Sequence, residues 1–483
     1  MKKNSVLKAI VITFLIYVVA SWIIPGGKFA SGVFSNSGTS PVGISDLFIY
    51  PISTFMTSIF VLVGIIVLLI GGLYGVMNKT GVYQNYVEKV AKKFKGKEKS
   101  FLVISVLLFA VLASLTTLTL PLFVLVPFFV AVILTLGFNK MTAMLSTVGA
   151  ILVGNMGTIF GYNTGGYSYV NYFFGIKLTE NIAFKIVLFV LLTAVLLFYV
   201  IKTSKIEKVS KTKKTTKKEE KETKEEVIIP LYTKAKTTKK SSTPLVIVVI
   251  LAFVISMVGM FNWAGALGVE KTIFDTLHSN ITSVKLNGYP LFANILGSLN
   301  ALGYWSNYEF AMLLALTTIV LGFVYNLKLK ETFEAAVEGM KEMLPVAVVA
   351  IVASILLLVV NSATATFFTA IFNALFELTK GFNFATMSLA TLIGSIGYND
   401  FPYLMNALYD PITALYASKV KEVAYILQVI YGFTMMLVPT SVGLVIGLEY
   451  LGISYKEWLK QNWKLLLSLF VVAIILIIVV VLV

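Results

Sequence analysis

The sequence contains no cysteine, which excludes disulfide bonds, thiolate metal sites and thiol nucleophiles. It also contains no arginine, because all 39 basic residues are lysine. The chain therefore lacks the planar guanidinium that binds a carboxylate through two hydrogen bonds. Its single histidine, His278, lies in the polar stretch "DTLHSN", where a solvated loop residue is expected rather than a catalytic base.

Charged residues are scarce as well, at 13% of the chain, whereas hydrophobic residues make up 58%. Several hydrophobic runs reach the roughly 18 residues that a bilayer-spanning helix needs. The first, at 6–24, lacks a small-residue cleavage pattern and is followed by more spans, so it is expected to remain uncleaved. We therefore predict an all-α, multi-pass protein of the bacterial plasma membrane. The net charge of +16 is explained by lysines that flank the spans and fix their orientation, and nucleic acid is not an expected partner.

A charged segment divides the chain into two halves. Residues 204–242 hold thirteen lysines and six glutamates with few apolar side chains, a composition typical of a disordered linker. The excess of lysine predicts that the linker is cytoplasmic. The predicted units are an N-terminal half, 1–203, and a C-terminal half, 243–483.

The two halves are weakly similar to each other at an offset of about 280 residues. The paired segments are 80–96 with 364–381, 120–140 with 401–421, and 152–158 with 436–443. Lysines lie at opposite ends of matched spans, which indicates that the two repeats have inverted topology. Inverted repeats with interrupted helices are typical of secondary transporters.

Each half contains two polar breaks within its apolar runs. They read "ASLTTLTLP" (113–121), "GNMGTIFGYNTGG" (154–166), "GSIGYNDFP" (394–402) and "VPTSVG" (438–443). Non-helical backbone at membrane depth is tolerated only where protein or a watery cavity satisfies it. We therefore predict re-entrant hairpins and broken helices whose breaks meet in one site. Helix kinks and small-residue packing are the alternative, and the paired recurrence favours a site. The end of the second break, 163–166, has no counterpart and is expected to be a loop or hinge.

Hydroxyl, amide and backbone groups at these breaks are the candidate ligands for a solute, because they bind without burying charge. The predicted substrate-binding residues are Ser114, Thr116, Thr117, Asn155, Gly157, Thr158, Ser395, Asn399, Thr440 and Ser441. Asp400 and Thr119 are the predicted ion-coupling residues, since an intramembrane carboxylate indicates a coupled cation, a proton or a bound amine. The alternative for Asp400 is an interfacial position outside the membrane. Enzyme motifs and metal-spaced ligands are absent, so we expect no enzyme activity, no metal and no cofactor beyond Na⁺ or H⁺ as a coupling ion.

Three stretches carry a resemblance to a known family. They are "SWIIPGGKF" (21–29), "GVYQNYVEKVAKKFKGKEK" (81–99) and "LVPTSVGLVIGLEYLGISYKEWLK" (437–460). There the chain resembles the YfcC-type carriers, which are related to the anaerobic four-carbon dicarboxylate carriers of the ion transporter superfamily. The resemblance implies an elevator-like homodimer whose site includes Asn155, Gly157, Thr158, Thr440 and Ser441. Members handle dicarboxylates, amino acids or arginine–ornithine exchange. The hairpin stretches "SLTTLTL" and "GYND" depart from the family pattern.

These observations predict a secondary active transporter of a small solute that bears a carboxylate, either an amino acid or a dicarboxylate. It would be coupled to a cation or would exchange solutes, with alternating access in the bilayer. A channel is one alternative, and it needs a continuous polar face along several helices. A membrane-embedded enzyme or assembly protein is another, and only Asp400, Asp410 and Glu449 offer the acid groups that it needs.

Overall fold

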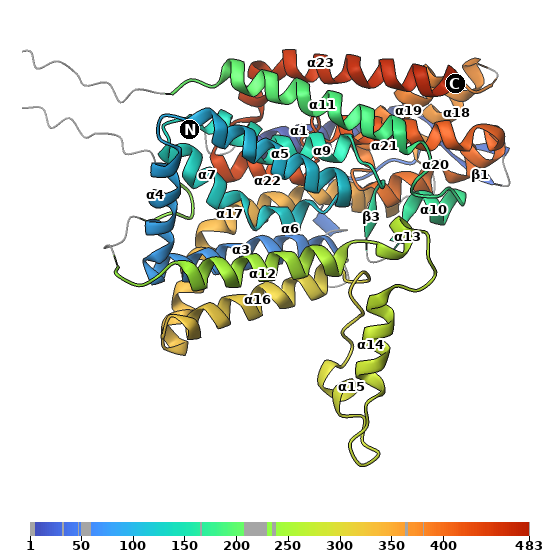
Figure 1. The fold of residues 1–483 in the computed structure, drawn as a ribbon. Coiled ribbons are helices and arrows are strands. Elements are labelled where there is room, and N and C mark those ends of the chain that lie inside the picture. Colours follow the sequence, from blue (N-terminus) through green and yellow to red (C-terminus); the bar gives the residue numbers. More distant parts are fainter. Residues whose placement is uncertain are drawn as a thin grey trace, which may run out of the picture.

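The computed structural model describes residues 5–30, 33–46, 48–49, 59–164, 167–206, 229–233, 238–362, 366–379 and 381–482. Within these ranges, eight helices are long and apolar enough to cross a bilayer, and most of them run roughly parallel to one another (Figure 1). They are α1 (Ser5–Ile23), α3 (Ile59–Thr80), α5 (Glu98–Thr116), α11 (Ile182–Thr203), α12 (Thr243–Met260), α16 (Asn307–Val324), α17 (Leu329–Ser362) and α23 (Tyr455–Leu482). The predicted all-α polytopic fold is confirmed.

In the first half, the interrupted apolar runs form short helices. After α3 come the amphipathic α4 (Val82–Phe94) and then α5, which ends where Thr117 adopts a φ of 55°. A left-handed threonine terminates the helix, because this conformation is unfavourable for residues other than glycine. The chain continues through α6 (Thr119–Phe123), α7 (Val126–Thr135), α8 (Lys140–Met144), the π-helical turn η1 (Leu145–Gly149) and α9 (Ala150–Met156).

The second half repeats this order of elements. After α17 come α18 (Phe367–Thr379), α19 (Phe384–Gly397), α20 (Phe401–Leu415), the 3₁₀ turn η2 (Ala417–Lys419), α21 (Val420–Thr434) and α22 (Val442–Leu451). Each half thus has a long helix, an amphipathic helix, two helices around a break, a broken helix and a final long helix. The matched order follows the sequence pairing, and the inverted relation between the halves stays a prediction.

Helices α3 and α17 pack through glycines. A Cβ atom added at Gly339 of α17 would overlap the carbonyl oxygen of Gly71 in α3, and one added at Gly75 would overlap the carbonyl oxygen of Ala335. Small residues let the two backbones approach closely, which is a common basis for helix association in membranes. These two long helices, one from each half, are therefore held tightly against each other.

Several elements were not predicted from the sequence. The antiparallel strands β1 (Gly26–Ala30) and β2 (Val33–Gly38) form a hairpin, and β3 (Asn163–Thr164) pairs with β4 (Tyr167–Ser168). The helix α10 (Tyr169–Phe174) follows β4. The predicted loop or hinge at 163–166 is therefore a strand in part, while Gly165 and Gly166 lie outside the described residues.

Residues 261–306 connect α12 to α16 and contain α13 (Trp263–Leu267), α14 (Ile273–Ser283) and α15 (Leu291–Leu296). Helices α14 and α15 project away from the other helices (Figure 1). The expectation that His278 lies in a loop is wrong, because it lies in α14. Thr272 and Asp275 form a capping box that satisfies the first backbone N–H groups of this helix and starts it.

Most of the linker predicted to be disordered lies outside the described residues. Of 204–242, the structure describes 204–206, 229–233 and 238–242. The prediction of disorder is wrong for 229–233, because Leu231 is completely buried against the helices. Burial of this apolar side chain and hydrogen bonds to its backbone offset the entropy lost on ordering.

Candidate solute-binding site

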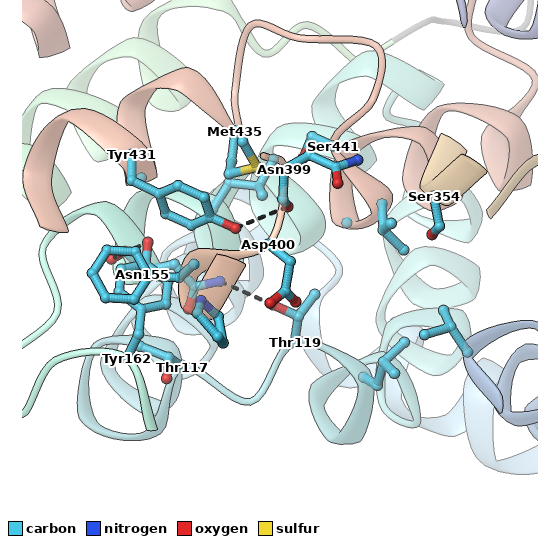
Figure 2. A pocket seen from close by; sticks show the side chains of 18 of the residues that line it. Thr117, Thr119, Asn155, Tyr162, Ser354, Asn399, Asp400, Tyr431, Met435 and Ser441 are labelled. Carbon is cyan, nitrogen blue, oxygen red and sulfur yellow. Dashed lines mark hydrogen bonds between the residues drawn. The ribbon is translucent and has the colours of Figure 1, made fainter. Parts of the chain in front are cut away.

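The four helix breaks meet around one cavity of about 480 Å³, a volume within the range of small-molecule sites. Each break contributes lining residues, and Figure 2 shows their side chains gathered from both halves of the chain. From the predicted set, the residues that line the cavity are Thr117, Thr119, Asn155, Asn399, Asp400 and Ser441. The sequence therefore located the breaks that surround this cavity, while the binding role of the residues stays a prediction.

The first half contributes a neutral oxygen that is free to bind. The Asn155 Nδ2 donates a hydrogen bond to Thr119 Oγ1 at 2.9 Å, which joins the end of α9 to the start of α6. The Tyr162 hydroxyl donates to the backbone oxygen of Asn155 at 3.1 Å. The side-chain oxygen of Asn155 is buried without a hydrogen-bond partner among the described residues. Because a buried amide oxygen without a partner is unfavourable, it is a natural ligand for a solute N–H or O–H group or a cation.

In the second half, an asparagine of the hairpin break holds the backbone together. The Asn399 Nδ2 donates to the backbone oxygens of Ala353 at 3.1 Å and Thr440 at 2.5 Å. The Tyr431 hydroxyl donates to the Asn399 backbone oxygen at 3.0 Å. Asn399 therefore links the break between α19 and α20 to α17 and to the break before α22.

A pair of threonine hydroxyls fastens each broken helix to its neighbouring hairpin. Thr158 Oγ1 donates to the backbone oxygen of Ser114 at 3.3 Å, and Thr440 Oγ1 donates to that of Ile396 at 3.2 Å. Both hydroxyls belong to residues that are at least nine-tenths buried. These bonds stabilise the non-helical backbone beside the cavity, as membrane depth requires.

Part of the predicted set does not line the cavity. These residues are Ser114, Thr116, Gly157, Thr158, Ser395 and Thr440. The hydroxyls of the five Ser and Thr residues donate to backbone carbonyls nearby, and Gly157 gives α11 room, because a Cβ there would lie 2.9 Å from the Cα of Phe189. The structure thus brings these residues to the walls behind the cavity, where they position the breaks.

Asp400 is the acidic residue among those that line the cavity. It occupies the N-cap position of α20, yet its side chain makes no capping hydrogen bond, and its carboxylate points into the cavity (Figure 2). A carboxylate at membrane depth needs a proton, a cation or a bound amine as its partner, and the position of Asp400 within the membrane stays a prediction. Asp410 lies exposed on the same helix, and Glu449 lines a different cavity.

Aromatic residues that sequence reasoning missed form one wall of the cavity. The rings of Tyr162 and Phe401 stack with centroids 4.5 Å apart, and the Tyr431 ring lies edge-on to both at 5.1 Å. Tyr162 and Phe401 lie within two of the polar breaks, so their positions in the chain offered a signal. Tyr431 and Ser354, which also line the cavity, lie within apolar runs where nothing distinguishes them.

The whole chain matches one protein family. The family model described as the C4-dicarboxylate anaerobic carrier, DcuC, matches residues 4–482. The chain belongs to this family. It is therefore a multi-pass membrane transporter and not an enzyme, and the resemblance to YfcC-type carriers and their dicarboxylate-carrying relatives is confirmed.

Two further comparisons add little to the family assignment. No curated protein matches the sequence significantly. The crystal structure of the YdaH transporter of Alcanivorax borkumensis aligns over 98% of both chains at 12% identity, with a TM-score of 0.39. This similarity is too low to carry an argument about the site of the present carrier.

Proposed function

We propose that this carrier is a secondary active transporter that binds a small carboxylate-bearing solute in the cavity between the four breaks. The observation that supports it best is the convergence of breaks from both halves on one cavity of about 480 Å³, with neutral ligands from several breaks and one carboxylate. The family description names C4-dicarboxylates, and a dicarboxylate or an amino acid fits the chemistry of these lining groups.

A solute carboxylate would bind without arginine, which this chain lacks. The N-termini of α20 and α22 begin directly after Asp400 and Ser441, both of which line the cavity. The first backbone N–H groups of a helix have no partners within the helix and attract anions. We infer that the N-terminus of α22 receives one carboxylate, because Asp400 repels an anion at α20 unless it is neutralised.

Asp400 distinguishes the two solute classes. An amino acid would place its ammonium group against the carboxylate of Asp400, and this contact would itself neutralise the charge. A dicarboxylate would require a coupled Na⁺ or H⁺ at Asp400 before both of its carboxylates could bind. The free side-chain oxygen of Asn155 and the hydroxyl of Thr119 are the neutral oxygens available to such a cation. Exchange of solutes is the alternative to ion coupling.

Alternating access would move the broken helices past a fixed frame, in the elevator manner. The glycine-packed pair of α3 and α17 suits the frame, because closely packed backbones resist sliding. We also propose that the two halves are inverted repeats and that the carrier is a homodimer. Repeats of this kind allow one arrangement of helices to open to either side of the membrane.

Uptake by proteoliposomes tests the proposal. The reconstituted carrier should take up labelled succinate or aspartate saturably, with a rate that depends on an imposed Na⁺ or pH gradient or on solute loaded inside. Flux without saturation would support a channel instead. No flux of any dicarboxylate or amino acid would contradict transport of this solute class. If Asn155→Ala combined with Ser441→Ala left saturable uptake unchanged, the cavity would not be the binding site.

A further inference from the structure

The charged linker contains one short apolar stretch, "IPLYT" at 229–233, that is bound to the helices. The Leu231 side chain is 0% exposed. The Leu231 backbone N–H donates to Glu342 Oε1 of α17 at 2.6 Å, and its backbone oxygen accepts from Asn78 Nδ2 of α3 at 3.0 Å. Both polar groups of this residue are therefore satisfied by side chains, as in a bound peptide.

The neighbours of Leu231 extend these contacts to two more helices. Gln84 Nε2 of α4 donates to the backbone oxygen of Thr233 at 2.6 Å. The Tyr450 hydroxyl of α22 donates to the backbone oxygen of Pro230 at 3.1 Å. The ring of Tyr232 lies edge-on to that of Tyr83 at 5.9 Å. The segment thus occupies a groove formed by α3, α4, α17 and α22.

The conformation of the segment indicates that the groove selects it. Leu231 has a φ of 53°, which is unfavourable for a residue with a Cβ atom. Such a conformation persists only where the surrounding contacts hold it. Burial of Leu231 and charge-assisted hydrogen bonding to Glu342 are contacts of this kind.

We propose that residues 229–233 are a latch, an internal peptide whose binding in this groove restrains α22 against α3 and α17. The N-terminal part of α22 lines the solute cavity through Val442, Gly443 and Ile446, and its last turn carries Tyr450, which binds the latch. The latch therefore connects a helix of the solute site to the glycine-packed pair. Its effect on transport rests on the proposed function, whereas its binding in the groove does not.

The latch borders a second cavity, so it is not packed on every side. This cavity, of about 300 Å³, is lined by Pro230, Glu342 and Tyr450 among others. If α22 moves relative to α3 and α17 during transport, the contacts with the latch must break. Binding of the latch then stabilises the conformation described here and slows departure from it, as any ligand selective for one state does.

Binding of the latch can be measured with a single cysteine, because the chain has none of its own. Gln84 is buried under the segment, so Gln84→Cys should react slowly with a water-soluble maleimide. Adding Leu231→Asp should release the segment and raise this rate by about tenfold or more, because opening exposes the protected site. The control Thr233→Asp adds the same charge at an exposed side chain and should leave the rate unchanged. Equal rates in all three proteins would overturn the proposal.

Transport tests the restraint in protein that keeps Leu231. A bifunctional thiosulfonate reagent should join the cysteines of Gln84→Cys/Thr233→Cys and lower turnover in proteoliposomes by about tenfold, since the bound state would be held permanently. A reducing agent should restore the rate. The pair Gln84→Cys/Val269→Cys, with Val269 exposed between α13 and α14, should show no effect.

The outcomes separate the two proposals. Efficient cross-linking with unchanged turnover would overturn the restraint, whatever solute is carried. Absence of uptake in the unmodified carrier would overturn the proposed function and the role of the latch in transport. Maleimide labelling needs no solute and would still decide whether the segment is bound.

Discussion

The two halves of the carrier build their breaks with the same framework and different chemistry. In each half a buried threonine hydroxyl donates to a carbonyl in the last turn of the helix that enters the hairpin break, from Thr158 to Ser114 of α5 and from Thr440 to Ile396 of α19. In each half an asparagine amide also joins the hairpin to the broken helix. These hydrogen bonds recur because both breaks face the same problem of unsatisfied backbone in lipid.

The difference lies in what remains free for a ligand. In the first half, the amide nitrogen of Asn155 donates to one hydroxyl, and its oxygen is buried without a partner among the described residues. In the second half, the amide nitrogen of Asn399 donates to two backbone carbonyls. The second half instead contributes the carboxylate of Asp400 to the cavity. The comparison teaches that a polar residue at a break can either hold the backbone or bind a ligand. The first half thus contributes only uncharged groups to the cavity lining, and the second half adds one charge.

The strongest test of this comparison is Asp400→Asn. Loss of the carboxylate should lower gradient-driven uptake by roughly 10- to 100-fold, the range expected when a hydrogen bond to a charged group is lost. The residual uptake should no longer respond to the Na⁺ or pH gradient. Both are measured in proteoliposomes with each gradient imposed separately. Asp410→Asn, at an exposed position of the same helix, should match the native protein. Gradient dependence that survives in Asp400→Asn would assign coupling elsewhere.

Asn155→Ala comes next, because it removes the free oxygen and leaves the second half intact. We expect the KM for uptake to rise about tenfold, the effect of losing one good hydrogen bond to a bound solute or ion. The thermal midpoint in detergent should change little, since only the bond to Thr119 is lost from the fold. A KM within twofold of the native value, with the ion dependence also unchanged, would show that this oxygen binds nothing.

Asn399→Ala should act in the opposite way, through stability. It removes the donor to the backbone oxygens of Ala353 and Thr440. The Ala353 oxygen keeps its partner within helix α17, whereas a buried Thr440 carbonyl left without a donor should destabilise the fold by roughly 1–3 kcal/mol. We expect a lower thermal midpoint and less folded protein, with a near-native KM in the fraction that folds. Fluorescence-detected size exclusion after heating measures the midpoint. A raised KM with unchanged stability would reverse the roles assigned to the two asparagines.

The positions of the breaks could be predicted from the sequence, because glycine, proline and polar residues inside apolar runs have few tolerable explanations at membrane depth. Thr117, Asn155, Asp400 and Ser441 were found in this way. The direction of each side chain could not be predicted. Ser114 and Thr117 lie within one helical turn, yet Thr117 alone of the two lines the cavity.

Contacts between residues that are far apart in the sequence could not be predicted either. The composition of the linker indicated disorder, although "IPLYT" overlaps its least polar stretch, "VIIPLY". Its acceptor Glu342 is 111 residues away from Leu231 along the chain, and Asn78 is 153 residues away. Composition describes the average of a whole segment. It therefore does not reveal that a few residues within the segment bind a groove formed by distant helices. Tyr431 was missed for a related reason, because only the fold separates it from other aromatic residues of apolar runs.

The smallest expected effects belong to the matched pair Thr158→Val and Thr440→Val. Valine keeps the shape of threonine and removes one hydrogen bond to a backbone carbonyl, so each change should lower the free energy of unfolding by about 1 kcal/mol. The KM should stay within about twofold of the native value, because neither residue lines the cavity. Thermal midpoints and uptake kinetics measured side by side check both statements. Equal small losses would establish that the two halves share a structural framework. A large rise in KM for one variant alone would show that its hydroxyl leaves the carbonyl and binds solute, and that the halves differ in framework as well as in charge.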